Sequence, residues 1–498
     1  MHAPVVGGGG GYGHAVVVGS SLAGLTAARA LANFMDQVTV VERDWVPRGP
    51  GRRRGVPQAR HTHSLMTAAQ QGLEQLFPGI RQDLTDAGAV HVRMPEDMLL
   101  LGPSGWLPRA DSGLSMLSAG RDLIDAVIRD RLLADPKVTF LREHEAVALQ
   151  PGRHDTVTGV WVRRRDRKTP GGWATRHLIS ADFVVDATGR GSRAPQWLAE
   201  LGYEPPHETV ADAGTAFATA VFAMPVGHVA DWKGLLLLPS PGDPVQGMLN
   251  PLEGGRWSVS VCVGDGRSLP TDHAGLLRAA DALRHPLLHD VLRGATPLGP
   301  VYGCRATENR WRHYEKLRRW PDQFLVLGDA FAAFDPVHGQ GMTAAVHSAL
   351  VLDHMLASHG TAVGLGYRLR RALAHRLAPA WRTSTRASRA AKDDQDPRAG
   401  LRTRLSRRYQ ARIAAAATRD PYAAKALLQL LQTAAPPATA LRPRVLRAAL
   451  RGPHGPAPTA PPTTTHGQDT HRRRPAAPPA PALGMSDSPP WHSLTRPV

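Results

Sequence analysis

The sequence comprises 498 residues, of which 42% are apolar and 20% charged, with a formal net charge of +18 and only two cysteines, Cys262 and Cys304. This composition is that of an ordinary globular protein, and it excludes fibrous and wholly disordered classes. Because the two cysteines are far apart and lack metal-ligand spacing, the sequence also excludes a disulfide scaffold and a zinc finger. No apolar run reaches the ~18 residues of a membrane span, and no secretory signal is visible, so we expect a cytoplasmic protein.

The positive charge is concentrated towards the C-terminus. Residues 361–498 contain 24 Lys and Arg against six Asp and Glu, whereas residues 1–360 contain 36 of each. A basic region of this kind can bind nucleic acid or an anionic membrane. Of the 60 basic residues, 54 are arginine, and the sequence is also rich in alanine and proline. This compositional bias fits a GC-rich genome better than a nucleic-acid surface, so we expect no nucleic-acid partner.

The first 42 residues predict a leader followed by a strand, a helix and a second strand. Residues 1–13 are rich in glycine, and we expect them to be flexible. An apolar run over 14–19 predicts a strand, alanines and leucines at helical spacing predict a helix over 22–34, and a second apolar run predicts a strand over 38–42. This order is typical of an α/β domain with a parallel sheet.

Two later apolar runs have the same character. They cover 182–186 and 324–328, and the second precedes a predicted helix over 341–356. Short apolar runs that end in Gly or Asp are typical of parallel strands buried on both faces. We therefore expect these strands to join the sheet that the first two begin.

The intervening and C-terminal regions differ from this pattern. Apolar residues alternate with a period of two over 215–222 and 257–263, which predicts a mostly antiparallel sheet inserted into the α/β domain. The last 47 residues are rich in proline, threonine and alanine, and we expect them to be disordered. Before them, four amphipathic stretches predict helices near 366–391, 401–417, 421–433 and 440–450.

The loop after the first strand has the pattern of a dinucleotide-binding turn. It reads Gly19-Ser-Ser-Leu-Ala-Gly24, and Glu42 ends the next strand. Such a turn needs a glycine for the tight bend, a small residue near the pyrophosphate and a third glycine for helix packing, with an acid for the ribose hydroxyls. The pyrophosphate then lies at the helix N-terminus. Ser21 stands at the middle glycine position, and an acid at 42 argues against a 2′-phosphate.

A second loop follows the strand at 324–328. Asp329 comes directly after that strand and can accept a hydrogen bond from a sugar-like hydroxyl. Pro336 and the sequence Gly339-Gln-Gly-Met342 then open a helix, which would bring backbone N–H groups against an electron-rich ring edge.

These loops resemble those of the group A FAD-dependent monooxygenases, the class of para-hydroxybenzoate hydroxylase and squalene epoxidase. The resemblance is closest to the branch in bacterial secondary metabolism that includes polyether epoxidases. Four stretches between residues 14 and 350 carry it: Gly19 to Gly24 with Glu42, residues 53–63 (RRGVPQARHTH), residues 186–193 (DATGRGSR), and residues 309–342.

The resemblance implies an α/β fold with a Rossmann-like FAD-binding domain, an inserted, mostly antiparallel substrate-binding sheet and a C-terminal helical region. The expected parts are a flexible leader (1–13), a first part of the FAD-binding domain (14–202), the inserted sheet (203–295), a second part of the FAD-binding domain (296–360), the helical region (361–451) and a disordered tail (452–498).

The resemblance also implies which residues hold FAD. The turn and Glu42 would hold the ADP half, Arg121 would reach the cofactor from a helix, Arg54 would pass near the ring, and Asp329 would contact the ribityl chain. The expected contacts are Gly19, Ser21, Leu22, Ala23, Gly24, Glu42, Arg43, Arg54, Arg121, Asp186, Gly328, Asp329, Pro336, Gly341 and Met342. The loop that lines the flavin ring is formed by Pro336, Gly339, Gln340, Gly341 and Met342, and no catalytic acid or base is identified.

The implied reaction is the transfer of one oxygen atom from O2 to a small apolar organic substrate, by epoxidation or hydroxylation. NAD(P)H would supply the electrons, either by docking in the cleft or through a separate flavin reductase. Ala187 follows Asp186 where the family has glycine, so the mode of nicotinamide docking stays open. His61 and His63 alternate along a short segment but lack a third ligand, so we expect no metal site.

Three alternatives remain open from the sequence. A reductase or dehydrogenase of the geranylgeranyl reductase type would share the fold. A halogenase would share it too, but the sequence has no Trp-x-Trp-x-Ile-Pro segment and its six lysines are scattered. The third is a basic adaptor without catalytic activity whose tail binds an anionic surface.

Overall fold

The structure is a computed structural model that describes residues 13–240, 245–264, 267–305, 307–393, 401–432, 434–452 and 458–463. Contacts divide the chain into one unit that ends at Pro462 and a second from Thr463 to Val498. The first unit is described below. The predicted leader, except Gly13, and most of the predicted tail lie outside the described residues.

A five-stranded parallel sheet forms the centre of the α/β part, as predicted. Its order is β21-β12-β1-β2-β8, and every neighbouring pair is parallel. All four strands predicted from apolar runs belong to it, because each buries valines or leucines on both faces. The strands are β1 (His14–Val18), β2 (Gln37–Glu42), β8 (Val138–Arg142), β12 (Phe183–Asp186) and β21 (Phe324–Val326).

Helices join this sheet in one hydrophobic core. α1 follows β1 and contacts β1, β2 and α8. α8 begins at Gly341, as predicted, and continues to His359. The helices of this part are α1 (Leu22–Ala32), α2 (Thr67–Leu76), α3 (Ile80–Asp86), α4 (Arg121–Leu133), α5 (Ala194–Glu200) and α8 (Gly341–His359).

Three small sheets accompany the central one. Their orders are β11-β10-β9, β13-β20-β22 and β3-β7-β4, and every pair is antiparallel. The strands are β3 (Ser64–Met66), β4 (Val90–Met94), β7 (Leu114–Ser118), β9 (His144–Pro151), β10 (Val157–Arg164), β11 (His177–Ser180), β13 (Glu208–Ala211), β20 (Asn309–Arg312) and β22 (Ala332–Ala333).

The inserted sheet has the order β18-β14-β17-β16-β15-β5-β6, and β19 also pairs with β14. It is mostly antiparallel, with one parallel pair between β15 and β5. It is wider than the predicted insertion 203–295, because β5, β6, β18 and β19 come from outside that range. Its strands are β5 (Met98–Gly102), β6 (Gly105–Trp106), β14 (Ala216–Ala223), β15 (Gly234–Leu237), β16 (Gln246–Leu252), β17 (Arg256–Val263), β18 (Thr296–Pro297) and β19 (Tyr302–Cys304).

The two faces of this sheet differ in burial. On one face, side chains such as Leu235, Leu249 and Val259 are fully buried in a core that includes α6 (His273–Asp281) and α7 (Leu287–Leu292). On the other face, Met248 and Leu236 stand opposite each other in register and are only half-buried. The rest of this second face is largely covered, since Leu236 packs against a further apolar cluster that includes β5 and α11, and Ser258 and Ser260 are buried.

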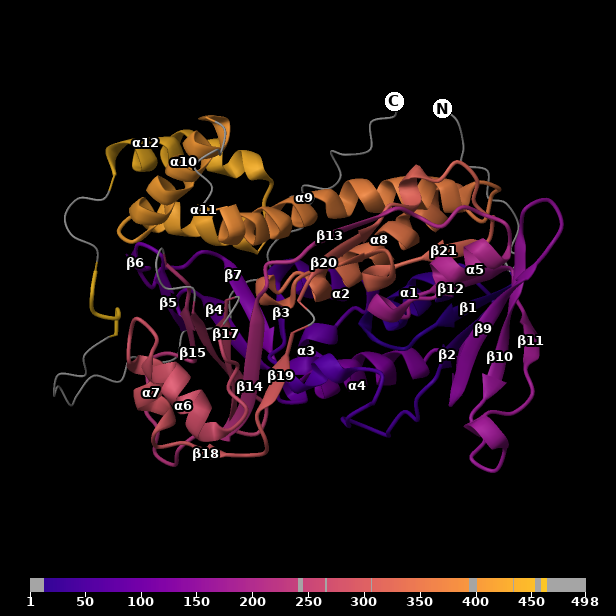
Figure 1. Ribbon diagram of the computed structural model, residues 1–498, viewed down its shortest axis with the longest axis horizontal. Coiled ribbons are helices and arrows are strands. Elements are labelled where there is room, and N and C mark those ends of the chain that lie inside the picture. Colours follow the sequence, from indigo (N-terminus) through magenta and orange to yellow (C-terminus); the bar gives the residue numbers. More distant parts are fainter. Residues whose placement is uncertain are drawn as a thin grey trace. The chain divides into compact units, whose positions relative to one another are not determined.

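In the part of the chain that the structure describes, four α-helices follow α8: α9 (Leu365–Asp393), α10 (Leu401–Ala417), α11 (Pro421–Leu431) and α12 (Pro443–Arg451). They agree closely with the four amphipathic stretches. α10 and α11 bury Ala417, Ala424 and Leu428 against apolar residues of β4, β5 and β7. Figure 1 shows α10 to α12 grouped at one end of the view and β9 to β11 at the other.

Candidate functional site

The glycine turn after β1 has the backbone that a dinucleotide-binding turn requires. Gly19 has a φ of +99°, which side chains other than glycine rarely adopt. A Cβ on Gly24 would overlap the carbonyl oxygen of Gly19, so α1 packs against the turn only because residue 24 is glycine. Ser21 is the N-cap of α1, and its side chain makes no capping hydrogen bond. The first N–H groups of α1 are thus available to an anion.

Glu42 lies at the end of β2 beside this turn and is buried. Its Oε2 accepts hydrogen bonds from the backbone N–H of Ser20 at 3.0 Å and from its hydroxyl at 2.6 Å. Its Oε1 accepts one bond, from the N–H of Asp44 at 2.8 Å. A carboxylate oxygen can accept two hydrogen bonds, so Oε1 retains capacity for a ribose hydroxyl.

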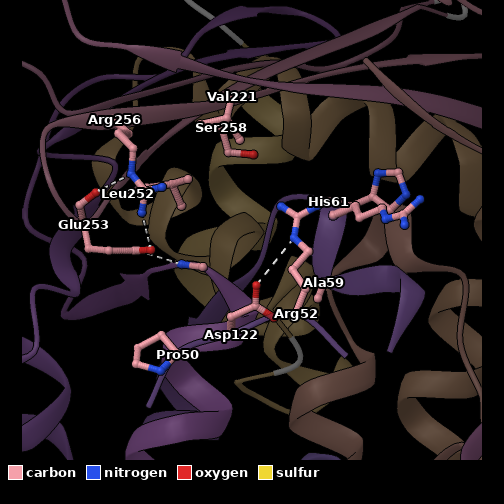
Figure 2. Close-up of a pocket in the computed structure, with 12 residues that line it drawn as sticks. Pro50, Arg52, Ala59, His61, Asp122, Val221, Leu252, Glu253, Arg256 and Ser258 are labelled. Atoms are coloured by element: carbon pink, nitrogen blue, oxygen red, sulfur yellow. Dashed lines mark hydrogen bonds and ion pairs between the residues drawn. The ribbon is translucent and has the colours of Figure 1, made fainter. Parts of the chain in front are cut away.

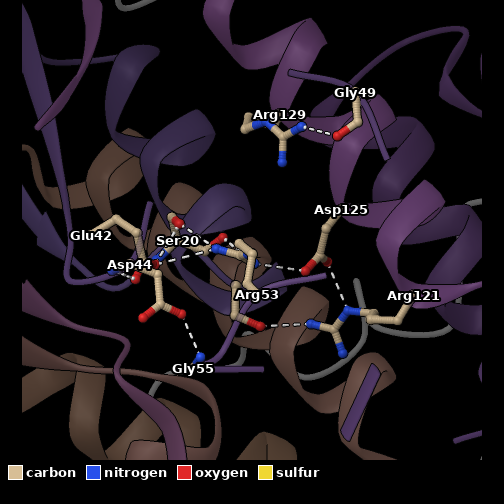
Figure 3. Close-up of polar contacts among 10 residues, drawn as sticks. Ser20, Glu42, Asp44, Gly49, Arg53, Gly55, Arg121, Asp125 and Arg129 are labelled. Atoms are coloured by element: carbon tan, nitrogen blue, oxygen red, sulfur yellow. Dashed lines mark hydrogen bonds and ion pairs between the residues drawn. The ribbon is translucent and has the colours of Figure 1, made fainter. Parts of the chain in front are cut away.

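Arg53 is a residue of this site that the sequence analysis did not select. Its Nη1 donates to the hydroxyl of Ser20 at 2.7 Å and lies 3.3 Å from Oε2 of Glu42, and its Nη2 donates to Oδ2 of Asp125 at 2.9 Å. Figure 3 shows the guanidinium between β2, the glycine turn and α4. The predicted arginine, Arg54, is exposed instead, and its contact with FAD stays a prediction.

Arg121 lies at the start of α4 and reaches the glycine turn, and its predicted contact with FAD stays a prediction. Its Nη2 donates to the hydroxyl of Ser21 at 2.6 Å, and its Nε donates to Oδ1 of Asp125 at 2.7 Å. Asp125 is therefore a buried carboxylate held between two buried arginines, with 5% of its side chain exposed. The result is two fixed guanidinium groups beside the N-terminus of α1, a donor set that fits a pyrophosphate.

Asp329 lies near Arg121, after β21. It has no hydrogen-bond or ion-pair partner among the described residues, and it is half-buried. Burial raises the pKa of Asp329, and the charges of Arg190, Arg121 and Arg312 oppose that rise. A half-buried carboxylate without a partner fits the role of acceptor for ribityl hydroxyls.

Asp186 has a different environment from Asp329. It is fully buried, Oδ1 accepts from the N–H and hydroxyl of Thr188, and Oδ2 accepts from the hydroxyl of Ser192 at 2.5 Å. Burial raises the pKa of Asp186, and these hydrogen bonds oppose the rise. The structure therefore shows Asp186 shaping the turn after β12, and a direct contact with a cofactor stays a prediction.

The predicted flavin-ring loop connects β22 to α8. Asp335 caps a short 3₁₀ helix that begins at Pro336, and Gly339 then adopts a φ of +63°. A Cβ on Gly341 would meet nothing within 4 Å, so protein packing does not require glycine there. Gln340 donates from Nε2 to the carbonyl of Leu431 at the end of α11, at 3.0 Å, which anchors the loop. The 19-residue α8 thus presents its N-terminus towards open space.

The segment 47–63, which we call the strap, joins the FAD-binding part to the half-buried face of the inserted sheet. The Thr62 hydroxyl bonds with those of Ser258 at 2.6 Å and Ser260 at 2.9 Å, and Ser260 bonds with Thr219 at 2.7 Å. His61 Nδ1 lies 3.0 Å from the Thr219 hydroxyl. These contacts form a continuous row of polar groups across β14 and β17, which period-two alternation alone could not reveal.

The two strap histidines are neutral at physiological pH. Burial, with the charges of Arg60 and Arg52, lowers the pKa of His61 to about 4. Burial and the charge of Arg121 lower the pKa of His63 to about 3. Within the described part of the chain, no three His, Cys, Asp or Glu side chains are grouped to hold a metal ion.

A pocket of about 260 Å³ lies where the strap, the start of α4 and the sheet meet. Figure 2 shows Arg52, Asp122 and His61 on one side and Val221, Ser258 and Arg256 on the other. Glu253, which follows β16 of the inserted sheet, also contacts the FAD-binding part, because its Oε2 accepts a hydrogen bond from the N–H of Gly120 at 2.8 Å. The FAD-binding part and the inserted sheet are therefore joined on both sides of the pocket.

Comparisons with known proteins agree with this geometry. The family described as "FAD binding domain" matches residues 13–387. The chain belongs to this family, which is of the group A flavoprotein monooxygenase type, and FAD is the cofactor that its turn, paired arginines and unpartnered Asp329 fit. The fold predicted from the sequence is thereby confirmed.

Individual relatives show how far the likeness extends. Protein Rv3254 of Mycobacterium tuberculosis (strain ATCC 25618 / H37Rv) is 34% identical over 380 residues, which cover 74% of this chain and 78% of that protein. Kynurenine 3-monooxygenase of Salinispora tropica is 25% identical over 365 residues, 69% of this chain and 72% of that protein. The crystal structure of PqsL of Pseudomonas aeruginosa, described as a probable FAD-dependent monooxygenase, shares the fold with a TM-score of 0.55 and 17% identity, over 77% of this chain and 97% of that one. No helix among the described residues is long and apolar enough to cross a membrane.

Proposed function

We propose that this chain is a monooxygenase that transfers one oxygen atom from O2 to an apolar organic substrate, by epoxidation or hydroxylation, in secondary metabolism. NAD(P)H, which is typical of the family, is the proposed electron donor, acting directly or through a separate flavin reductase. Bound FAD would supply the redox and oxygen chemistry. The residues of the chain would bind the cofactor, orient the substrate and exclude water.

The ADP half of FAD would bind at the glycine turn. The N–H groups of α1 and the guanidinium groups of Arg53 and Arg121 would hold the pyrophosphate, and Oε1 of Glu42 would accept from the ribose. The hydrogen bonds of Asp125 to both arginines support this proposal, because they fix the two guanidinium groups before any phosphate arrives.

The flavin half would extend towards α8. Asp329 would accept hydrogen bonds from the ribityl chain, and the loop from Pro336 to Met342 would line the ring. The N-terminus of α8 would stabilise negative charge on the ring edge nearest to it, a contribution of about 0.3 to 2 kcal/mol. The open space beside Gly341 supports this placement.

The half-buried face of the inserted sheet is the observation that carries the substrate proposal. It combines two half-buried apolar side chains, Leu236 and Met248, with the buried hydroxyl row that begins at Thr219. A pocket with apolar walls and a few convergent polar groups is the usual form of a small-molecule site. An apolar substrate would pack on this face and present one atom to the flavin.

The two reaction types place different demands on this face. Epoxidation requires no deprotonation of the substrate, whereas hydroxylation of a phenol is assisted by a base. His61 is hydrogen-bonded to Thr219, but its pKa of about 4 makes it too weak a base to take a proton from a phenol efficiently at pH 7.

Anaerobic reduction of the purified protein by NADH and by NADPH, with and without candidate substrates, tests the proposal. We expect the visible absorption of oxidised flavin to bleach, faster with substrate, and one O2 to be consumed per product on readmission of air. Product formed without proportional O2 consumption would instead establish a reductase or dehydrogenase. Purified protein without flavin absorption, even after incubation with FAD, would support the basic adaptor.

A further inference from the structure

The last three helices differ in charge from the rest of the chain. Residues 401–452 contain eleven Lys and Arg and one acidic residue, Asp420. The carboxylate of Asp420 is engaged, because it caps α11 through the N–H groups of Tyr422 and Ala423. This segment lies beyond the family match, which ends at residue 387, so binding of FAD does not account for its charge.

The positive charges gather on the outer sides of α10 and α12. On α10, Arg408 and Arg412 are four residues apart and share one side of the helix. On α12, Arg444, Arg447 and Arg451 are three and four residues apart, and all are exposed. The two sets meet, because Nη2 of Arg412 donates to the carbonyl of Leu450 at 3.3 Å.

These charges are not neutralised within the described part of the chain. Arg408, Arg447 and Arg451 form no ion pair with a described carboxylate. Arg444 lies over the ring of Tyr422, 5.6 Å from its centroid, a contact that leaves its charge uncompensated. Like charges at this density repel one another and destabilise a helix pair slightly, so folding alone does not explain them.

Large apolar side chains lie among these arginines. Leu405 on α10 and Leu450 on α12 are 54% and 67% exposed, although the inner sides of these helices are buried. Leu441, which ends the 3₁₀ helix Pro437–Leu441 just before α12, is 62% exposed. Leu450 stands beside Arg451 and next to the side chain of Arg412. The outer face of α10 and α12 therefore combines cationic and apolar groups, and we call it the basic face.

We propose that the basic face docks on an anionic phospholipid membrane. Arginines near a membrane surface are attracted by anionic headgroups, and leucines gain free energy by entering the boundary between headgroups and acyl chains. A nucleic acid would use the arginines but would leave the three leucines in water. The mixture of the two residue types therefore favours the membrane.

Vesicle sedimentation of the full-length, FAD-loaded protein tests this proposal. We expect sedimentation with vesicles of phosphatidylcholine and phosphatidylglycerol, and none with phosphatidylcholine alone. Raising NaCl from about 0.1 M to about 1 M shortens the Debye length from about 10 to about 3 Å, so it should release most of the protein.

Two triple variants, each with three fewer positive charges, distinguish an effect of the basic face from an effect of the overall net charge. R408Q/R447Q/R451Q removes three charges from the face, and R153Q/R164Q/R167Q removes three exposed charges near β10, at the other end of Figure 1. At about 1 kcal/mol per arginine, the first should weaken vesicle binding on the order of a hundredfold and the second should have little effect. L450Q should weaken it roughly fivefold, without changing the salt dependence. The flavin content of each variant reports its folding.

Several results would overturn the proposal. These are equal binding to neutral vesicles, equal losses in the two triple variants, and no sedimentation with anionic vesicles. Tighter binding of a DNA or RNA duplex than of anionic vesicles, lost in R408Q/R447Q/R451Q, would show that the basic face is a nucleic-acid surface instead.

Discussion

Arg53 and Asp125 form a buried ion pair, with Nη2 of Arg53 2.9 Å from Oδ2 of Asp125 and about 5% of each side chain exposed. The pair connects the strap to α4 across the glycine turn. Because Asp125 also accepts from Arg121, the two arginines that we propose to hold the pyrophosphate share one buried carboxylate. The geometry of the phosphate site therefore depends on Asp125 as well as on the arginines.

Replacing Arg53 by methionine should reduce FAD retention and stability together. The variant removes a phosphate donor and leaves Glu42 and Asp125 each with one fewer partner, a change that costs about 3 kcal/mol for a buried pair. Flavin content after gel filtration and the Tm of the apoprotein measure the two effects. Arg54→Met is the matched control, since Arg54 is exposed. Loss of FAD in the Arg54 variant but not in the Arg53 variant would reverse our assignment.

The choice between these two arginines shows what the sequence could not provide. Both lie in the segment that resembles the family, and only the path of the backbone between Pro50 and Val56 decides which one points inwards. In the same way, β5 reads as an apolar run, but nothing local indicates that it pairs with β15, more than 130 residues later. Pairings at such separation depend on tertiary packing rather than on local pattern.

Other parts of the fold were predicted because they depend on local patterns. The strands of the central sheet are short apolar runs, and the glycine turn has fixed spacing to Glu42. The mostly antiparallel inserted sheet follows from alternation, but its hydroxyl row required the structure, because Thr62 and Ser260 are 198 residues apart. The roles of the site residues stay predictions until the variants below are measured.

Gly24→Val should abolish FAD retention. Even a Cβ at this position overlaps the carbonyl oxygen of Gly19, so the variant must separate α1 from the turn and move the N–H groups that would face the pyrophosphate. Gly341→Ala serves as a control, because a Cβ there meets nothing within 4 Å. Full FAD occupancy in purified Gly24→Val would remove the basis for placing the pyrophosphate at this turn.

Asp329→Asn should weaken FAD binding but stabilise the apoprotein at neutral pH. The folded protein raises the pKa of Asp329, so the ionised carboxylate costs folding free energy once the pH exceeds that pKa, and the cost disappears as the pH falls below the unfolded value of 3.8. Asparagine keeps one oxygen acceptor but loses the charge and the second oxygen, and the loss of a hydrogen bond to a charged group should cost about 1.5 to 3 kcal/mol of binding. Tm of the apoprotein at pH 7 and pH 4, and FAD titration, separate the two effects. A variant with lower Tm and unchanged FAD affinity would contradict both the expected stabilisation of the apoprotein and the expected loss of FAD binding.

The strap histidines should make the protein less stable as the pH falls from about 6.5 to about 3. Their pKa values are about 4 and about 3 in the folded protein, whereas the unfolded chain takes up these protons near 6.5. The unfolded state therefore binds more protons over this interval. Above pH 6.5 the contribution of the two histidines to the free energy of unfolding is constant. His63→Gln should make Tm fall less steeply between pH 6.5 and 4. The exposed control His354→Gln should leave this slope unchanged. An equal slope in both variants would show that other groups cause the acid sensitivity.

Gly341→Leu should lower the reduction potential of the bound flavin without removing it. The side chain would enter the open space at the N-terminus of α8, and it would push that terminus away from the ring edge where the reduced flavin carries negative charge. The helix terminus stabilises a nearby anion by about 0.3 to 2 kcal/mol. Loss of this contribution should therefore disfavour the reduced anion by up to about tenfold or more. Gly341→Ala, with one added carbon, should show a smaller effect in the same direction. Potentiometric titration gives the midpoint potentials, and stopped-flow reduction by NAD(P)H should slow in the same order. A Gly341→Leu protein that holds FAD at an unchanged potential would show that the α8 terminus does not face the flavin.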